Sequence, residues 1–361
     1  MMFGLIFSLC GSFFLLIGLV APFYYWGCLA RAADLGIIQL QKMFLKDRPL
    51  RWQLALLFVF ALFSYVISLS AMWTGWAIIW IGLLIVSYLV LRAYLRRLIR
   101  YSDPLFLLDR LSKMDCKKFA KGNEQAIYEL VDNVAEVAVK AAHKNSAILA
   151  RHAISFLLPL IEFYIEVASR RAPQEGELPL LDRVNSFTAY LSKSLFWVYK
   201  EALKRGLDPV SEEAVTVLGK ISLFLCRHHP DSAHLPLLFM EKASVTAIDL
   251  GNEEVIFRIS ATLAELAKNL VLLSAEKNES YQEPIILVLN HLDDHVKKSF
   301  AKKSDLSPVF FMQPFAEIGQ LFADPRVENV PNRDEILGVL RKHLAEFNLL
   351  DLVAKQKGKI S

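Results

Sequence analysis

The stretch LRAYLRRLIRYSDP, residues 91–104, divides the sequence into two parts of different character. Residues 1–100 contain nine Lys and Arg but only two acids, Asp34 and Asp47, whereas the rest of the chain contains 32 Lys and Arg against 35 acids. At 54% hydrophobic and 22% charged, the whole is too apolar for an ordinary soluble protein and too charged for one buried in lipid. We therefore expect a membrane anchor (1–100) followed by a cytoplasmic domain (101–361). The net charge of +4 comes from the anchor and does not favour a nucleic-acid partner.

Three apolar stretches, 3–26, 52–70 and 76–94, are of the length that crosses a bilayer, since about 30 Å of hydrocarbon takes roughly 20 helical residues. The third reaches into Arg92, whose side chain can extend to the headgroups. The first lacks the positive start and the small-residue cleavage site of a secretory signal, which favours a retained anchor. Tryptophans at or near the ends of the stretches are typical of a membrane interface: Trp26, Trp52, Trp73, Trp76 and Trp80.

Basic residues predict the orientation of these spans. The loop 31–51 holds five Lys and Arg, four arginines follow the third span, and the connection 70–75 has no charge. Positive segments stay on the cytoplasmic side. We expect an integral, multi-pass protein of a bacterial inner membrane, with its N-terminus outside and its C-terminal domain in the cytoplasm.

The arginines within 91–104 form a candidate lipid site. Arg92, Arg96 and Arg100 recur every four residues and so share one helix face, with Arg97 beside them. The positive-inside rule predicts arginines after a last span, so a topology signal that binds no particular lipid is favoured, and the alternative is that these four face anionic headgroups. Ser102, Asp103 and Pro104 then predict the start of a new helix.

Beyond residue 103 the periodicity is helical and strand signals are almost absent. Apolar residues recur every three or four positions in 126–142, 214–226, 255–273 and 336–353. Turn-forming segments separate such stretches, and we expect nine or ten helices. The fold class is therefore all-α: three transmembrane helices and a cytoplasmic helical domain.

An internal match favours stacked helical hairpins. GNEQAIYELVDNVAEVA begins at Gly122 and GNEEVIFRISATLAELA at Gly251, with seven of seventeen positions identical. The offset of 129 residues equals three units of 43, the size of a HEAT or armadillo repeat, so the pattern resembles α-solenoids in general. A weaker match relates 211–221 to 252–262. The alternative is an irregular helical bundle.

The sequence contains no recognised catalytic, nucleotide-binding or metalloprotease motif, and we expect no cofactor and no enzymatic activity. His291 and His295 have the i, i+4 spacing of a metal chelate, but Lys297 and Lys298 follow, so a solvated helix face is favoured over a metal site. The segment 226–234, with Cys226 and three histidines, is interpreted as a helix end running into a turn, which is favoured over a zinc site.

Three function hypotheses follow. The first is a membrane-anchored scaffold or adaptor, because stacked hairpins present extended protein-binding surfaces. Its expected partners are membrane lipids and a protein bound to the cytoplasmic domain, and a homo-oligomer is an option. The second is a non-conducting subunit of a transport or motor complex, although the spans lack the ionisable residues of ion pathways. The third is a membrane-bound enzyme with an unrecognised site.

Overall fold

The computed structural model describes residues 47–69, 73–101, 103–170, 178–302 and 308–357, with residues 6, 9–14, 16, 17, 20, 23 and 27. All regular elements in these ranges are helices, and the described residues contain no strand. The chain divides into two compact units, Met1–Lys113 and Met114–Ser361. Of the predicted first span (3–26), only residues 6, 9–14, 16, 17, 20 and 23 are described, all of them helical, and most of the predicted loop 31–51 lies outside the described residues.

The first unit is built on two antiparallel helices, α3 (Arg48–Leu69) and α4 (Trp73–Tyr101). Their contact is partly polar: the Trp80 indole donates a hydrogen bond to Ser64 Oγ (3.0 Å), and Ser64 donates to the carbonyl of Phe60 (3.0 Å). Trp80 is buried against α3 and does not face outward from the pair. An indole with a hydrogen-bond partner on the next helix can be buried without leaving its donor unsatisfied.

The division at 91–104 is confirmed as a helix boundary. Helix α4 continues through all four arginines to Tyr101, and α5 (Pro104–Ala120) begins at the proline. The Asp103 carboxylate accepts a hydrogen bond from the backbone N–H of Leu105 (3.0 Å), which satisfies one of the free donors at the start of α5. Proline suits this position because it has no N–H to leave unpaired.

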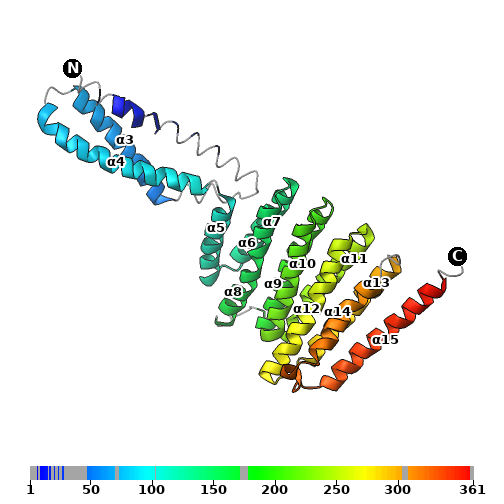
Figure 1. Ribbon diagram of the computed structural model, residues 1–361. Coiled ribbons are helices and arrows are strands. Elements are labelled where there is room, and N and C mark those ends of the chain that lie inside the picture. Colours follow the sequence, from blue (N-terminus) through cyan, green and yellow to red (C-terminus); the bar gives the residue numbers. More distant parts are fainter. Residues whose placement is uncertain are drawn as a thin grey trace. The chain divides into compact units, whose positions relative to one another are not determined.

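The second unit is a stack of helices in two layers (Figure 1). One layer contains α6 (Gln125–His143), α9 (Leu180–Leu203), α11 (His234–Leu250), α13 (Gln282–Lys302) and α15 (Arg333–Lys357). The other contains α7 (Ala147–Ser155), α8 (Leu157–Arg170), α10 (Asp208–His228), α12 (Glu253–Lys277) and α14 (Pro308–Leu321). Short 3₁₀ turns, η1 (Pro230–Ser232) and η2 (Pro325–Val327), lie between helices. Eleven α-helices are described from Pro104 onward, so nine or ten was an underestimate. Stacked hairpins are confirmed over an irregular bundle for this part of the chain.

The same turn chemistry ends several of these helices. Gly122, Gly206, Gly251 and Asn145 have positive φ, between 56° and 100°, which glycine and asparagine adopt more readily than other residues. At each turn two backbone N–H groups donate back to carbonyls in the last turn of the helix; for Gly251 these bonds run from its own N–H to Ile248 and from Asn252 to Ala247. This is the Schellman arrangement, and it stops the helix and reverses the chain.

The internal match does not mark equivalent positions. Gly122 precedes α6 and Gly251 precedes α12, but α6 packs beside α9 in one layer, whereas α12 packs beside α10 in the other. Helices of the first layer begin at residues 180, 234, 282 and 333, spacings that all exceed 43 residues. The predicted repeat unit was therefore too short. The weaker match relates segments of α10 and α12, which are neighbours in one layer, but it aligns Ser211, the fourth residue of α10, with Asn252, which precedes α12.

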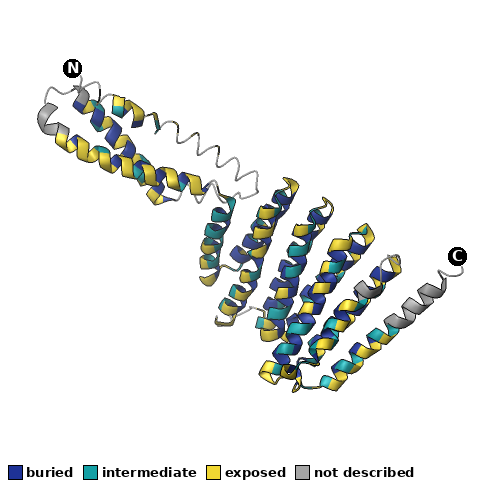
Figure 2. Ribbon diagram, viewed as in Figure 1, coloured by how far each residue is buried: buried dark blue, intermediate teal, exposed yellow. Residues whose placement is uncertain are grey.

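Burial differs between the units: α3 and α4 carry many exposed residues, whereas the helices of the second unit carry many buried ones (Figure 2). Three helical segments are long and apolar enough to cross a membrane by length and composition: Arg48–Ile67, Ile78–Tyr101 and Ala147–Arg170. The last comprises α7 and α8, which are broken at Phe156 and pack against α6, α9 and α10. Its large residues Leu157, Ile161 and Tyr164 are fully buried in the stack, so its hydrophobicity is explained by the core.

Candidate anion-binding site

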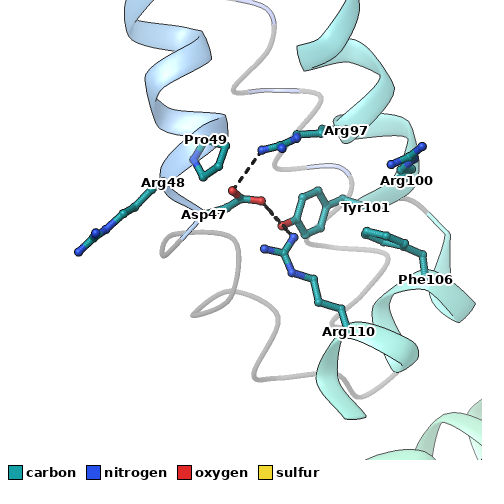
Figure 3. Close-up of a pocket in the computed structure, with 8 residues that line it drawn as sticks. All are labelled: Asp47, Arg48, Pro49, Arg97, Arg100, Tyr101, Phe106 and Arg110. Carbon is teal, nitrogen blue, oxygen red and sulfur yellow. Dashed lines mark hydrogen bonds and ion pairs between the residues drawn. The ribbon is translucent and has the colours of Figure 1, made fainter. Parts of the chain in front are cut away.

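A pocket of about 470 Å³ lies in the first unit, at the end of the α3–α4 pair where α5 begins (Figure 3). Its walls come from all three helices and carry four arginines and one acid. The lining residues are Asp47, Arg48, Pro49, Arg97, Arg100, Tyr101, Phe106 and Arg110. Their formal charge is +3.

Asp47 organises the pocket. It precedes α3, and its Oδ1 accepts from the backbone N–H of Leu50 (3.4 Å), a helix-capping contact. Its Oδ2 accepts from the Tyr101 hydroxyl (2.5 Å) and from Arg110 Nη1 (3.0 Å). The carboxylate is only 4% exposed. A buried carboxylate must be paired, so these contacts fix the ends of α3 and α4 and the first turns of α5 relative to one another.

The arginines differ in what they contact. Arg97 Nη1 lies 3.5 Å from Asp47 Oδ1, and its side chain is 39% exposed. Arg110 also donates to the Tyr101 hydroxyl, and its guanidinium lies over the Tyr101 ring, 5.1 Å from the centroid. Arg48 and Arg100 are exposed at the pocket and have no ion-pair partner among the described residues.

The structure separates the predicted arginine stripe into two pairs. Arg97 and Arg100 line the pocket, whereas Arg92 and Arg96 are exposed and do not. Sequence reasoning missed Asp47 and Arg110 as members of the site. A signal for Asp47 was present, since it is one of two acids in the first hundred residues and a charged group there needs a partner. Arg110 had no such signal, because its position depends on the turn at Asp103.

Of the tryptophans predicted to lie at the membrane interface, the structure describes the side chains of only some. Trp52 is 69% exposed at the start of α3. Trp73 and Trp76 belong to the first turn of α4, but their side chains lie outside the described residues, as does Trp26 altogether.

His295 does not lie on a solvated face, so that expectation was wrong. It is buried, with Nδ1 2.5 Å from Ser244 Oγ and Nε2 3.0 Å from the carbonyl of Ile256. A neutral ring can accept from the serine through Nδ1 and donate to the carbonyl through Nε2. Burial lowers the pKa of His295 to about 4. Because both ring nitrogens are engaged, His295 has no lone pair to offer a metal with His291.

A cluster of ionisable side chains joins α13 to α15. Asp293, His343 and Glu346 each bring a possible ligand atom within 4.8 Å of the others. Lys297 Nζ, however, lies 2.7 Å from Asp293 Oδ2 and 2.7 Å from Glu346 Oε2. The ammonium group already supplies the positive charge between the carboxylates, so the cluster acts as an ion-pair network between the two helices.

The segment around Cys226 matches its predicted structure. Helix α10 ends at His228, and η1 follows at Pro230. Cys226 is buried, and burial raises its pKa to about 12. A thiol of this kind is a core residue and not a nucleophile.

Comparisons with known proteins add only weak likenesses. No family model matches the chain, and no curated protein matches it. A de novo designed helical repeat protein, DHR64, aligns with a TM-score of 0.32 and 16% identity over 61% of this chain and 98% of its own. A circular tandem repeat protein with a novel repeat topology aligns with a TM-score of 0.24 and 13% identity, covering 99% and 97%. The assignment of stacked hairpins rests on the helix contacts described above.

Proposed function

We propose that this chain is a membrane-anchored helical scaffold, in which the first unit spans the membrane and the second presents a protein-binding surface at its cytoplasmic face. The observation that carries the proposal is the exposed apolar surface of α3 and α4. Only 33% of the apolar stretch of α3 and 22% of that of α4 is buried within the protein. No Asp, Glu, Lys, Arg or His occurs between Trp52 and Leu91.

The exposed side chains of this pair are those that lipid would solvate. They include Leu56, Val59, Leu62 and Val66 on α3 and Ile78, Ile81, Ile85 and Leu89 on α4. Soluble proteins rarely expose a continuous apolar surface of this extent. Helices suit hydrocarbon because their backbone groups are satisfied internally.

The ion pair between Asp47 and Arg97 supports the proposed orientation. It places the basic start of α3 and the basic end of α4 at the same end of the pair. Cytoplasmic loops carry the excess of Lys and Arg. The uncharged residues 73–75 begin α4 at the other end, which would then face the outside.

The second unit offers a surface suited to a protein partner. Trp197 on α9 and Leu238 and Val245 on α11 are 45%, 44% and 41% exposed. The two helices are neighbours, and the Tyr199 hydroxyl donates to the carbonyl of Ala243 (2.8 Å). Exposed tryptophan is enriched among the residues that dominate binding energy at protein interfaces.

Crosslinking and affinity purification of the full chain from native membranes test this function. We expect one stoichiometric partner to copurify with the unaltered chain. The partner should be lost from the double variant Trp197→Ser/Leu238→Ser. The matched control, Ile148→Ser/Leu178→Ser, removes exposed apolar side chains elsewhere on the unit and should retain it. Recovery of a large membrane assembly with both variants would instead support a transport-complex subunit, and recovery of no partner would contradict a scaffold.

A further inference from the structure

We propose that the pocket around Asp47 binds a phosphate group, presented either by an anionic lipid headgroup or by a soluble phosphate ester. The pocket is large enough for such a group, at about 470 Å³, and its lining has a formal charge of +3. Guanidinium groups bind phosphate through paired N–H donors whose spacing matches two phosphate oxygens.

Among the described residues, most N–H donors of the pocket arginines have no acceptor. Arg97 and Arg110 use Nη1 for their contacts with Asp47, and no described residue accepts from the Nη2 or Nε of either. Arg48 and Arg100 have no acceptor among the described residues. Each guanidinium carries five N–H donors, so Arg97 and Arg110, which meet at Asp47, can each bind an anionic oxygen, with Arg100 nearby on the same helix end and Arg48 at the edge of the pocket (Figure 3).

The single acid of the pocket positions these donors and does not compete for the ligand. Asp47 is only 4% exposed, and both of its carboxylate oxygens are already engaged. Each oxygen contacts one arginine and accepts one further hydrogen bond, from a backbone N–H or from the Tyr101 hydroxyl. Fixing Arg97 and Arg110 in advance reduces the side-chain entropy lost when an anion binds.

The remaining walls are apolar and can accept the non-phosphate part of the ligand. Pro49 lies beside Asp47, and the Phe106 ring packs edge-on against Tyr101, with centroids 5.9 Å apart (Figure 3). A glycerol backbone or a sugar could rest against this side. If the first unit spans the membrane as proposed, the pocket lies where headgroups are found, so the lipid source rests on that proposal and the soluble source does not.

The test uses the purified full chain in micelles of a neutral detergent, with fluorescent short-chain phosphatidic acid as the probe. The pocket variant is Arg48→Gln/Arg100→Gln. Its matched control is Arg92→Gln/Arg96→Gln, which makes the same change in charge at exposed residues of the same region outside the pocket. Loss of two charge-assisted contacts should weaken binding at least about tenfold, whereas the control should stay within about twofold.

Competition distinguishes the two sources of phosphate. Displacement of the probe by inorganic phosphate and glycerol 3-phosphate indicates a soluble ester, whereas displacement by unlabelled phosphatidic acid alone indicates a headgroup. Either result supports the phosphate site. Equal losses in the two variants, or no saturable binding, would overturn it. The micelle assay does not require the helices to cross a bilayer, so a phosphate site can be confirmed even if the membrane topology is refuted.

Discussion

Substitution of Gly219 by alanine tests the packing of α10 on α12. A Cβ built at Gly219 would lie 2.5 Å from Thr262 Cγ2, closer than carbon atoms approach without displacement. Thr262 cannot easily move, because it is β-branched and its hydroxyl donates to the carbonyl of Arg258 (2.8 Å). Gly338 in α15 is the matched control, since a Cβ there meets nothing within 4 Å.

The expected changes in the free energy of unfolding follow from two opposing effects. Replacing glycine by alanine inside a helix stabilises by about 0.8–1 kcal/mol, and overpacking a core costs about 1–3 kcal/mol. We therefore expect Gly338→Ala to raise the free energy of unfolding and Gly219→Ala to leave it unchanged or lower it by up to about 2 kcal/mol. Because 1 kcal/mol corresponds to roughly 2–4 °C in a unit of this size, the variants should differ in Tm by about 2–12 °C.

Thermal unfolding followed by circular dichroism of the full chain in detergent provides the assay. Thr262→Ser removes the clashing methyl group and keeps the hydroxyl, so it should rescue Gly219→Ala in a double-mutant cycle. If Gly219→Ala stabilises as much as Gly338→Ala does, α10 and α12 do not approach closely, and the packing described for this layer is wrong.

Three further predictions concern the second unit. Ile127→Ala and Ile256→Ala should each lower the free energy of unfolding by about 2–5 kcal/mol in chemical denaturation, since both side chains are buried; a surface-like change in either would place it outside the core. Lowering the pH from 6.5 to 4 should destabilise the unit by up to about 3 kcal/mol, because over that range the unfolded chain binds a proton at His295 that the folded chain does not. His295→Gln should flatten this pH dependence, and an unaltered slope would assign it to other groups. In a chain with no other cysteine, Cys226 should react with maleimide at pH 8 only after denaturation, since its thiol is buried and its pKa is raised to about 12; rapid native labelling would contradict this.

Helices were predictable from the sequence because their signals are local. The periodicity over 255–273 corresponds to α12, Glu253–Lys277, and the proline after Asp103 marks the start of α5. Where two helices meet is not a local property. The G-N-E segments share a glycine with positive φ that ends one helix just before the next begins, but only Asn252 caps its helix, since α6 has no side-chain cap. These segments could not reveal in which layer of the stack each following helix lies. That depends on how many helices separate α6 from α12 and on the break between α7 and α8.

The candidate site was predictable in part for the same reason. The arginines after the third apolar stretch stand out in composition, but their directions depend on Asp47, which lies 50 residues away from Arg97 along the chain. His295 shows the same limit. Its spacing from His291 fixes a shared face but not whether that face meets solvent, and the adjacent Lys297 suggested exposure although it pairs with Asp293.

The central claim is that the α3–α4 pair crosses a membrane and holds the helical stack on the cytoplasmic side. Single cysteines placed at Thr74, near the start of α4, and at Arg205, in the turn between α9 and α10, test it directly in a chain without other cysteines. The account predicts that an impermeant maleimide labels the Thr74→Cys protein in intact spheroplasts, and labels the Arg205→Cys protein only after lysis. Labelling of both positions from the same side, or only of Arg205→Cys before lysis, would contradict it.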